Sequence, residues 1–164
     1  VYGLARRFSS SPDKCRQPVS PPYPPLMETP KIIASGDAEA SSPGAFAVYC
    51  LCAEWCGTCR DYRPGFIGLA AQFPRVRFGW LDIEERADDL GDLDIENFPT
   101  LLIMRGDLVL FFGTMLPHLG QLQRTIEVFL AQTPEESLAY AHSDNERKRW
   151  QENADLRFIG RLSL

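Results

Sequence analysis

The feature that most limits how this chain can fold is a pair of cysteines between an apolar segment and an amphipathic one. Residues Ala45–Cys52 form a near-continuous apolar run of strand length, which is typical of a strand buried on both faces. Cys56 and Cys59 follow closely, and apolar side chains recur at three- and four-residue intervals from there to about Phe73. This spacing predicts a helix that begins at Cys56 and contains Pro64. The chain is therefore expected to pass from a buried strand into a helix that carries two thiols at its start.

The position of Cys56 favours redox chemistry over metal binding. The first backbone N–H groups of a helix have no partner within the helix, and with the helix dipole they stabilise a thiolate. Cys59 lies one turn further on, close enough to close a small disulfide ring. A zinc site would need more ligands at suitable spacing, and the two histidines, His118 and His142, are distant and unpaired. We expect no metal and no cofactor, since the sequence has no flavin, nucleotide or haem motif.

The pattern downstream of the helix predicts an α/β sandwich. Apolar alternation and a turn signal at Arg105-Gly106-Asp107 predict three further strands, the last two forming a hairpin. We expect a mixed sheet with a parallel centre and an antiparallel edge hairpin, flanked by helices. The predicted strands are 76–82, 100–104 and 108–112, and the predicted helices are 85–93 and 121–131.

Composition divides the chain into three parts. Residues 1–30 hold seven of the 13 prolines and are predicted to be an extended or disordered tail, with Met27 as a candidate natural start. Residues 31–132 carry the strand and helix pattern and form the predicted domain. Residues 133–164 are more polar, and Thr133-Pro134-Glu135-Glu136 predicts the start of an extra C-terminal helix that runs to about Trp150.

The stretch around the two cysteines resembles the active site of the thioredoxin family. Residues 53–60 read Ala-Glu-Trp-Cys-Gly-Thr-Cys-Arg, with Thr58 where most members have proline. The resemblance continues with Pro64 in the helix, with Phe98-Pro99-Thr100 as the family's cis-proline loop, and with Gly113 after the last strand. It covers about residues 31–132 and implies a thioredoxin fold and thiol–disulfide exchange activity.

The resemblance also implies a role for each matching residue. Cys56 would attack a substrate disulfide, and Cys59 would then release the substrate and leave a Cys56–Cys59 disulfide. Pro99, expected in the cis form, would face the two sulfurs and leave the backbone of Phe98 free to pair with an extended substrate. The residues expected to contact substrate are Trp55, Gly57, Thr58, Phe98, Pro99 and Gly113.

Two further cysteines depart from the family's pattern. Thioredoxins place a buried Asp six residues before the first active-site cysteine and an aromatic residue four before it, and here these positions are Cys50 and Cys52. The loss of the buried acid should slow resolution by Cys59. The two thiols share one face of a strand, so a second redox pair or a soft-metal site is possible. The favoured interpretation is two buried small hydrophobic residues, because neighbours on one strand close strained disulfides.

We predict a thioredoxin-type enzyme that reduces disulfide-containing proteins and is recycled by a reductase similar to thioredoxin reductase. One alternative is a disulfide oxidant or isomerase, because Thr58 should make the disulfide more oxidising than in Gly-Pro members. Another is a thioredoxin-like protein-binding module without essential redox activity, whose acidic stretch at residues 82–96 or C-terminal helix selects the partner.

Charge and segment composition predict where such a protein acts. A net charge of −5 argues against nucleic acid and anionic membranes as partners, and the longest apolar run is too short to cross a bilayer. The first residues do not resemble a secretory signal, which predicts a cytoplasmic protein. The resemblance to thioredoxins implies a part in electron transport and redox homeostasis. We expect it to be a monomer.

Overall fold

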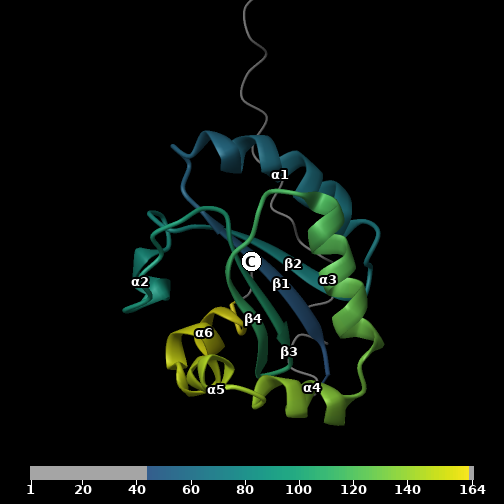
Figure 1. Ribbon diagram of the computed structural model, residues 1–164. Coiled ribbons are helices and arrows are strands. Elements are labelled where there is room, and N and C mark those ends of the chain that lie inside the picture. Colours follow the sequence, from purple (N-terminus) through teal and green to yellow (C-terminus); the bar gives the residue numbers. More distant parts are fainter. Residues whose placement is uncertain (1–43, 163–164) are drawn as a thin grey trace, which may run out of the picture. The chain divides into compact units, whose positions relative to one another are not determined.

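A four-stranded mixed sheet forms the centre of the computed structural model, which describes residues 44–162. The strand order is β2-β1-β3-β4, in which β1 and β2 are parallel and the other two pairs are antiparallel (Figure 1). The predicted parallel centre and antiparallel edge hairpin are confirmed. The predictions for residues 1–30, including a start at Met27, lie outside the described residues. The strands are β1 (Phe46–Cys52), β2 (Val76–Asp82), β3 (Thr100–Arg105) and β4 (Leu108–Thr114).

β1 is buried along its whole length because it lies between two neighbouring strands of the sheet and between two layers of helices, one on each face. Its side chains alternate between the faces of the sheet, so that Val48 and Cys50 enter one core cluster while Tyr49 and Leu51 enter the other. A strand covered on both faces needs a continuous apolar sequence, which is what residues 45–52 provide.

The hairpin between β3 and β4 turns through two residues. Arg105 pairs with Leu108, which leaves Gly106 and Asp107 as the loop. Gly106 has a φ of 56°, in the left-handed region that glycine adopts without a steric cost. A glycine at the first position of a two-residue loop is typical of a type II′ turn, whose twist suits the flanking strands. The hairpin predicted from Arg105-Gly106-Asp107 is confirmed.

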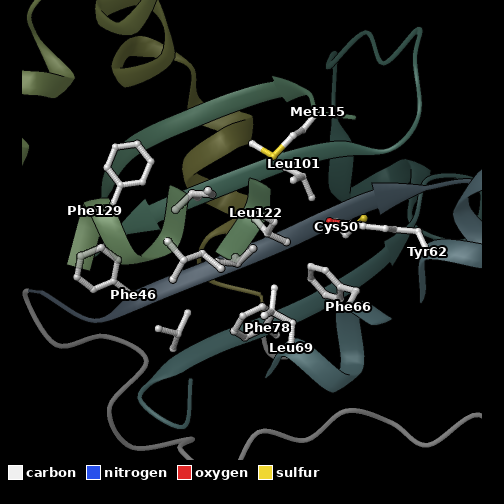
Figure 2. Close-up of a cluster of buried hydrophobic side chains, with 14 of the residues drawn as sticks. Phe46, Cys50, Tyr62, Phe66, Leu69, Phe78, Leu101, Met115, Leu122 and Phe129 are labelled. Carbon is white, nitrogen blue, oxygen red and sulfur yellow. The ribbon is translucent and has the colours of Figure 1, made fainter. Parts of the chain in front are cut away.

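Helices α1 (Gly57–Ala70) and α3 (Leu119–Ala131) cover the face of the sheet that holds Cys50. The buried stripe of α1 has the spacing of one helix face, and Pro64 lies inside the helix on its exposed side. Figure 2 shows part of this cluster, with Phe66 from α1 close to Phe78 of β2. The stripe consists of Cys59, Tyr62, Phe66 and Leu69.

Helices near the C-terminal end of the chain cover the opposite face of the sheet. The core cluster there joins the side chains of β1 to Leu156 and Ile159 of α6 (Ala154–Ile159) and to Leu90 of α2 (Ala87–Leu90). Figure 1 shows α5 (Asn145–Glu152) and α6 beside β4, away from α1 and α3. Residues 133–162 therefore supply one of the two layers that bury the sheet.

The single C-terminal helix predicted to end near Trp150 is three helices. The first, α4 (Pro134–Ala141), starts with the predicted cap at Thr133, whose side chain and that of Glu136 form a reciprocal capping box. The side chains of Asp144 and Asn153 then accept hydrogen bonds from the first turns of α5 and α6. Each new cap begins a new helix direction, and this allows α6 to turn back onto the sheet. No helix in residues 44–162 is both long and apolar enough to cross a membrane.

The Tyr49 hydroxyl links the two ends of the described chain. Its ionisation should make the free energy of unfolding depend on pH in the alkaline range. The hydroxyl donates to the carbonyl oxygen of Gly160 at 3.1 Å. Burial, opposed in part by the nearby Arg77, raises the pKa of Tyr49 from 10.0 to about 12. The pKa of Tyr49 is higher in the folded than in the unfolded chain. The protonated hydroxyl therefore contributes in full to the free energy of unfolding below pH 10, and this contribution is lost as the pH rises to about 12.

We expect Tyr49→Phe to lower the free energy of unfolding at neutral pH by about 1 kcal/mol and to weaken its alkaline decline. The decline should not vanish, since burial also raises the pKa of Tyr62 and of Cys50. Denaturant unfolding at a series of pH values measures both effects. Tyr140→Phe, at a half-buried tyrosine, serves as the control. An alkaline decline as steep in Tyr49→Phe as in the wild type would contradict the assignment.

Candidate redox site

The end of β1 and the start of α1 bring four cysteines together. Cys50 and Cys52 lie on β1, Cys56 is the N-cap of α1, and Cys59 lies in the first turn of that helix. The chain turns tightly between them, with the Cys56 N–H donating to the carbonyl oxygen of Ala53 at 3.0 Å. Cys56 is half-buried and the other three are buried, so Cys56 is the thiol of this group that a large substrate can reach.

Cys59 is joined by a disulfide to Cys52, with 6.0 Å between their Cα atoms, and Cys56 is free. The disulfide predicted between Cys56 and Cys59 is therefore not the one present. The interpretation of Cys52 as an inert hydrophobic residue is wrong. The physical reason is the direction of Cys59, which belongs to the inward stripe of α1 and so faces the end of β1. A redox pair of Cys56 and Cys59 stays a prediction.

Cys50 remains a buried free thiol, as its interpretation as a small hydrophobic residue predicted. Burial, and then the nearby Cys56, raise its pKa well above the usual range, so it stays protonated at neutral pH. Figure 2 shows the Tyr62 side chain reaching from α1 toward Cys50. The Tyr62 hydroxyl is buried without a hydrogen-bond partner among residues 44–162, and burial, then at strongly alkaline pH the ionised Cys50, raises its pKa. The site thus rests on a buried layer that is uncharged at neutral pH.

An exposed aromatic pair lies beside Cys56. The Trp55 side chain is 63% exposed, and its ring meets that of Phe98 edge to face, with 5.6 Å between the ring centres. The indole Nε1 of Trp55 donates to a carboxylate oxygen of Glu84 at 3.0 Å, which fixes how the ring is held. Phe98 and Pro99 are joined by a cis peptide bond, as predicted. The structure therefore brings Trp55 and the loop around Pro99 together.

The other residues predicted to contact substrate lie around this pair. Gly57 and Thr58 are exposed in the first turn of α1, and Thr58 borders a surface hollow that Pro117 also lines. Gly113 lies near the end of β4, which is tied to the loop of Pro99 by a hydrogen bond from the Met115 N–H to the Pro99 carbonyl oxygen at 3.3 Å. Within residues 44–162, no group of three or more His, Cys, Asp or Glu residues is placed to hold a metal ion.

Two contacts of the site were not predicted from the sequence, namely the bond of Cys52 to Cys59 and the hydrogen bond of Trp55 to Glu84. The signal for Cys52 was its place four residues before the first cysteine of the pair, at the end of the strand that leads into the helix. The signal for Glu84 was weaker, because it is one of many acids in residues 82–96 and only the fold shows which of them meets Trp55.

Comparison with known proteins finds similarity to thioredoxins in sequence and in structure. A thioredoxin family model matches residues 39–113. The chain is 31% identical over 75 residues to a thioredoxin of Chlamydia pneumoniae, which is 46% of this chain and 74% of that protein. It is 36% identical over 53 residues to an H-type thioredoxin of Picea mariana, covering 32% of this chain but only 42% of that protein. The crystal structure of a poplar thioredoxin h matches with a TM-score of 0.52 and 25% identity, over 58% of this chain and 85% of that one.

Proposed function

The chain belongs to the thioredoxin family of thiol–disulfide oxidoreductases, and we propose that it reduces disulfide bonds in proteins with Cys56 as the attacking thiol. The observation that carries this proposal is the exposure pattern of the cysteines: Cys56 is free and reachable at the start of α1, next to the exposed ring of Trp55, while Cys59 lies buried one turn behind it. An accessible thiol backed by a buried one is the arrangement that two-step disulfide exchange requires.

The proposed reaction starts from the form in which Cys56 and Cys59 are both thiols. The Cys56 thiolate attacks one sulfur of the substrate disulfide and forms a mixed disulfide, and the other substrate sulfur leaves and takes up a proton. Cys59 then gives up its proton and attacks the Cys56 sulfur, which releases the second substrate thiol. Two electrons pass from the cysteine pair to the substrate, and a dithiol enzyme similar to thioredoxin reductase restores the pair.

The surface around Cys56 suits an extended, partly apolar segment of a substrate protein. Trp55 and Phe98 offer aromatic contact area next to the thiol. Phe98 precedes β3 and lies outside the strand ladder, so its backbone groups can pair with a chain that lies across the site. The proposed substrates are therefore proteins whose disulfide lies in an exposed segment that can adopt an extended form.

The test is the rate at which the protein catalyses reduction of a model disulfide protein by dithiothreitol. We expect Cys56→Ser to lose the whole rate enhancement, because no other thiol of the group is reachable. Cys50→Ala is the matched control, since Cys50 is buried behind the site, and it should keep the wild-type rate. Equal rates for the wild type and Cys56→Ser would disprove the proposal.

The reduction potential of the cysteine pair decides the direction of the reaction. A potential near that of thioredoxin, about −270 mV, supports a reductase, whereas a value near that of a strong oxidant, about −120 mV, contradicts it. The measurement is an equilibrium titration against a glutathione buffer.

A further inference from the structure

We infer that Cys52 is a third redox residue, which takes Cys59 from Cys56 by internal thiol–disulfide exchange and so moves the disulfide from the reachable site into the core. The inference rests on the proposed function, because the Cys56–Cys59 disulfide that enters the exchange is the product of substrate reduction. It adds to that function an oxidised form in which Cys56 is again a thiol but has no partner.

The position of Cys59 between two partners carries the inference. It is bonded to Cys52, with 6.0 Å between the Cα atoms, and both residues are 1% exposed. It also follows Cys56 by three positions at the start of a helix, where side chains are neighbours about 5–6 Å apart at Cβ. The 6.0 Å between the Cα atoms of Cys52 and Cys59 lies within the range of disulfides, whereas a bond from Cys59 to Cys56 requires their Cβ atoms to approach to about 3.5–4.5 Å. The Cys59 sulfur can therefore pair with the half-buried Cys56 or with the buried Cys52.

The exchange conserves atoms and electrons. The Cys52 thiol gives up its proton, its sulfur attacks the Cys59 sulfur, and the Cys56 sulfur leaves as a thiolate that takes up a proton. One S–S bond breaks and one forms, so no external oxidant or reductant takes part. The free backbone N–H groups at the start of α1 favour Cys56 as the leaving group, because they face a developing negative charge there.

Tyr62 and Cys50 explain why the exchange stops at Cys52. The buried hydroxyl of Tyr62 has no hydrogen-bond partner in the part of the chain that the structure describes, and it points into the cluster. It stays protonated because burial raises its pKa, so it is a donor available to a thiolate that forms there. The Cys50 sulfur is 3.7 Å from that of Cys52, but burial raises the pKa of Cys50 and keeps it a thiol, which is a poor nucleophile. Cys50 therefore does not pull the disulfide one step further.

The consequence is a form that binds substrates without releasing them. With Cys59 held by Cys52, a mixed disulfide at Cys56 lacks the thiol that resolves it in the proposed reaction, and Cys50, the other free thiol of residues 44–162, is buried. The buried bond is also shielded from an external dithiol, so this form should return to the reduced state slowly. The exchange thus switches the protein from a two-thiol reductase to a one-thiol acceptor.

Disulfide mapping of the oxidised full chain tests the inference. The reduced protein is oxidised with glutathione disulfide, quenched with acid, alkylated and digested, and the linked peptides are identified by mass spectrometry. We expect the wild type to show the Cys52–Cys59 link with Cys56 alkylated or bound to glutathione. Cys52→Ala should show only the Cys56–Cys59 link. Cys50→Ala, changed on the same strand face, should keep the wild-type pattern.

Re-reduction kinetics provide a second measurement. Oxidised Cys52→Ala should be reduced by dithiothreitol about tenfold or more faster than oxidised wild type, since its disulfide is reachable. A wild type that shows only the Cys56–Cys59 link, or that is reduced as fast as Cys52→Ala, overturns the inference and leaves the proposed function intact. Failure of the proposed function is recognised separately, as equal catalytic rates of the wild type and Cys56→Ser. Cys52→Ser repeats the comparison if Cys52→Ala does not fold.

Discussion

Replacing Leu156 by alanine is expected to lower the free energy of unfolding by about 2–5 kcal/mol, although α6 contains no cysteine and lies about a hundred residues after the redox site. Leu156 is 1% exposed and belongs to the core cluster that covers one face of β1. Its loss removes apolar burial and leaves a cavity against the sheet, and the two terms add. Denaturant unfolding measures the change.

Phe158→Ala is the matched control for this prediction. Phe158 lies on the same helix, two residues further on, and its side chain is 50% exposed. We expect a change within about 0.5 kcal/mol, as for most exposed positions. If the two variants lose the same stability, α6 does not belong to the cooperative core. If they differ as expected, the folding unit does not end at residue 132 and includes the C-terminal helices.

Replacing Cys59 by serine is expected to turn a short-lived covalent complex into a stable one. In the proposed reaction Cys59 frees the substrate from Cys56, and a serine hydroxyl cannot attack the mixed disulfide. Nearly all of the Cys59→Ser protein should therefore become linked to an excess of a model disulfide protein. Non-reducing electrophoresis and mass spectrometry measure the linked fraction, which dithiothreitol should abolish.

The double variant Cys56→Ser, Cys59→Ser separates this complex from adventitious linkage. Both variants carry Cys15→Ser in addition, so that the double variant keeps only the buried Cys50 and Cys52 and should form no complex, because neither thiol is reachable. Linkage by the double variant at the level of Cys59→Ser would show that Cys56 is not the attacking thiol. The comparison needs no knowledge of the natural substrate.

Local patterns were enough to predict the elements that local interactions determine. The apolar run at 45–52, the Gly106 turn and the capping box at Thr133 each act over a few residues, and each forms the predicted element. The end of the chain was predicted poorly because α5 and α6 begin at single capping residues, Asp144 and Asn153, within a polar sequence. Their arrangement depends on packing against a sheet far away in the sequence.

The redox site also divides into features that local interactions determine and one that depends on packing between distant segments. The turn from β1 to α1, the half-buried Cys56 at its N-cap and the cis bond at Pro99 follow from residues close together in the chain. The partner of Cys59 does not, because it depends on how α1 is rotated about its axis relative to the end of β1. Spacing shows which thiols can meet along a helix, but not which thiol a neighbouring strand presents to them.

The hydrogen bond from Tyr49 to Gly160 joins residues 111 positions apart, and this separation has a consequence for synthesis of the protein. A ribosome makes the strand with Cys50 and Cys52 long before it makes the helix that covers the strand's other face. Until then this apolar surface is open to solvent and to other chains, and it is prone to aggregation. The nascent chain therefore exposes during this interval an apolar surface that the finished protein buries.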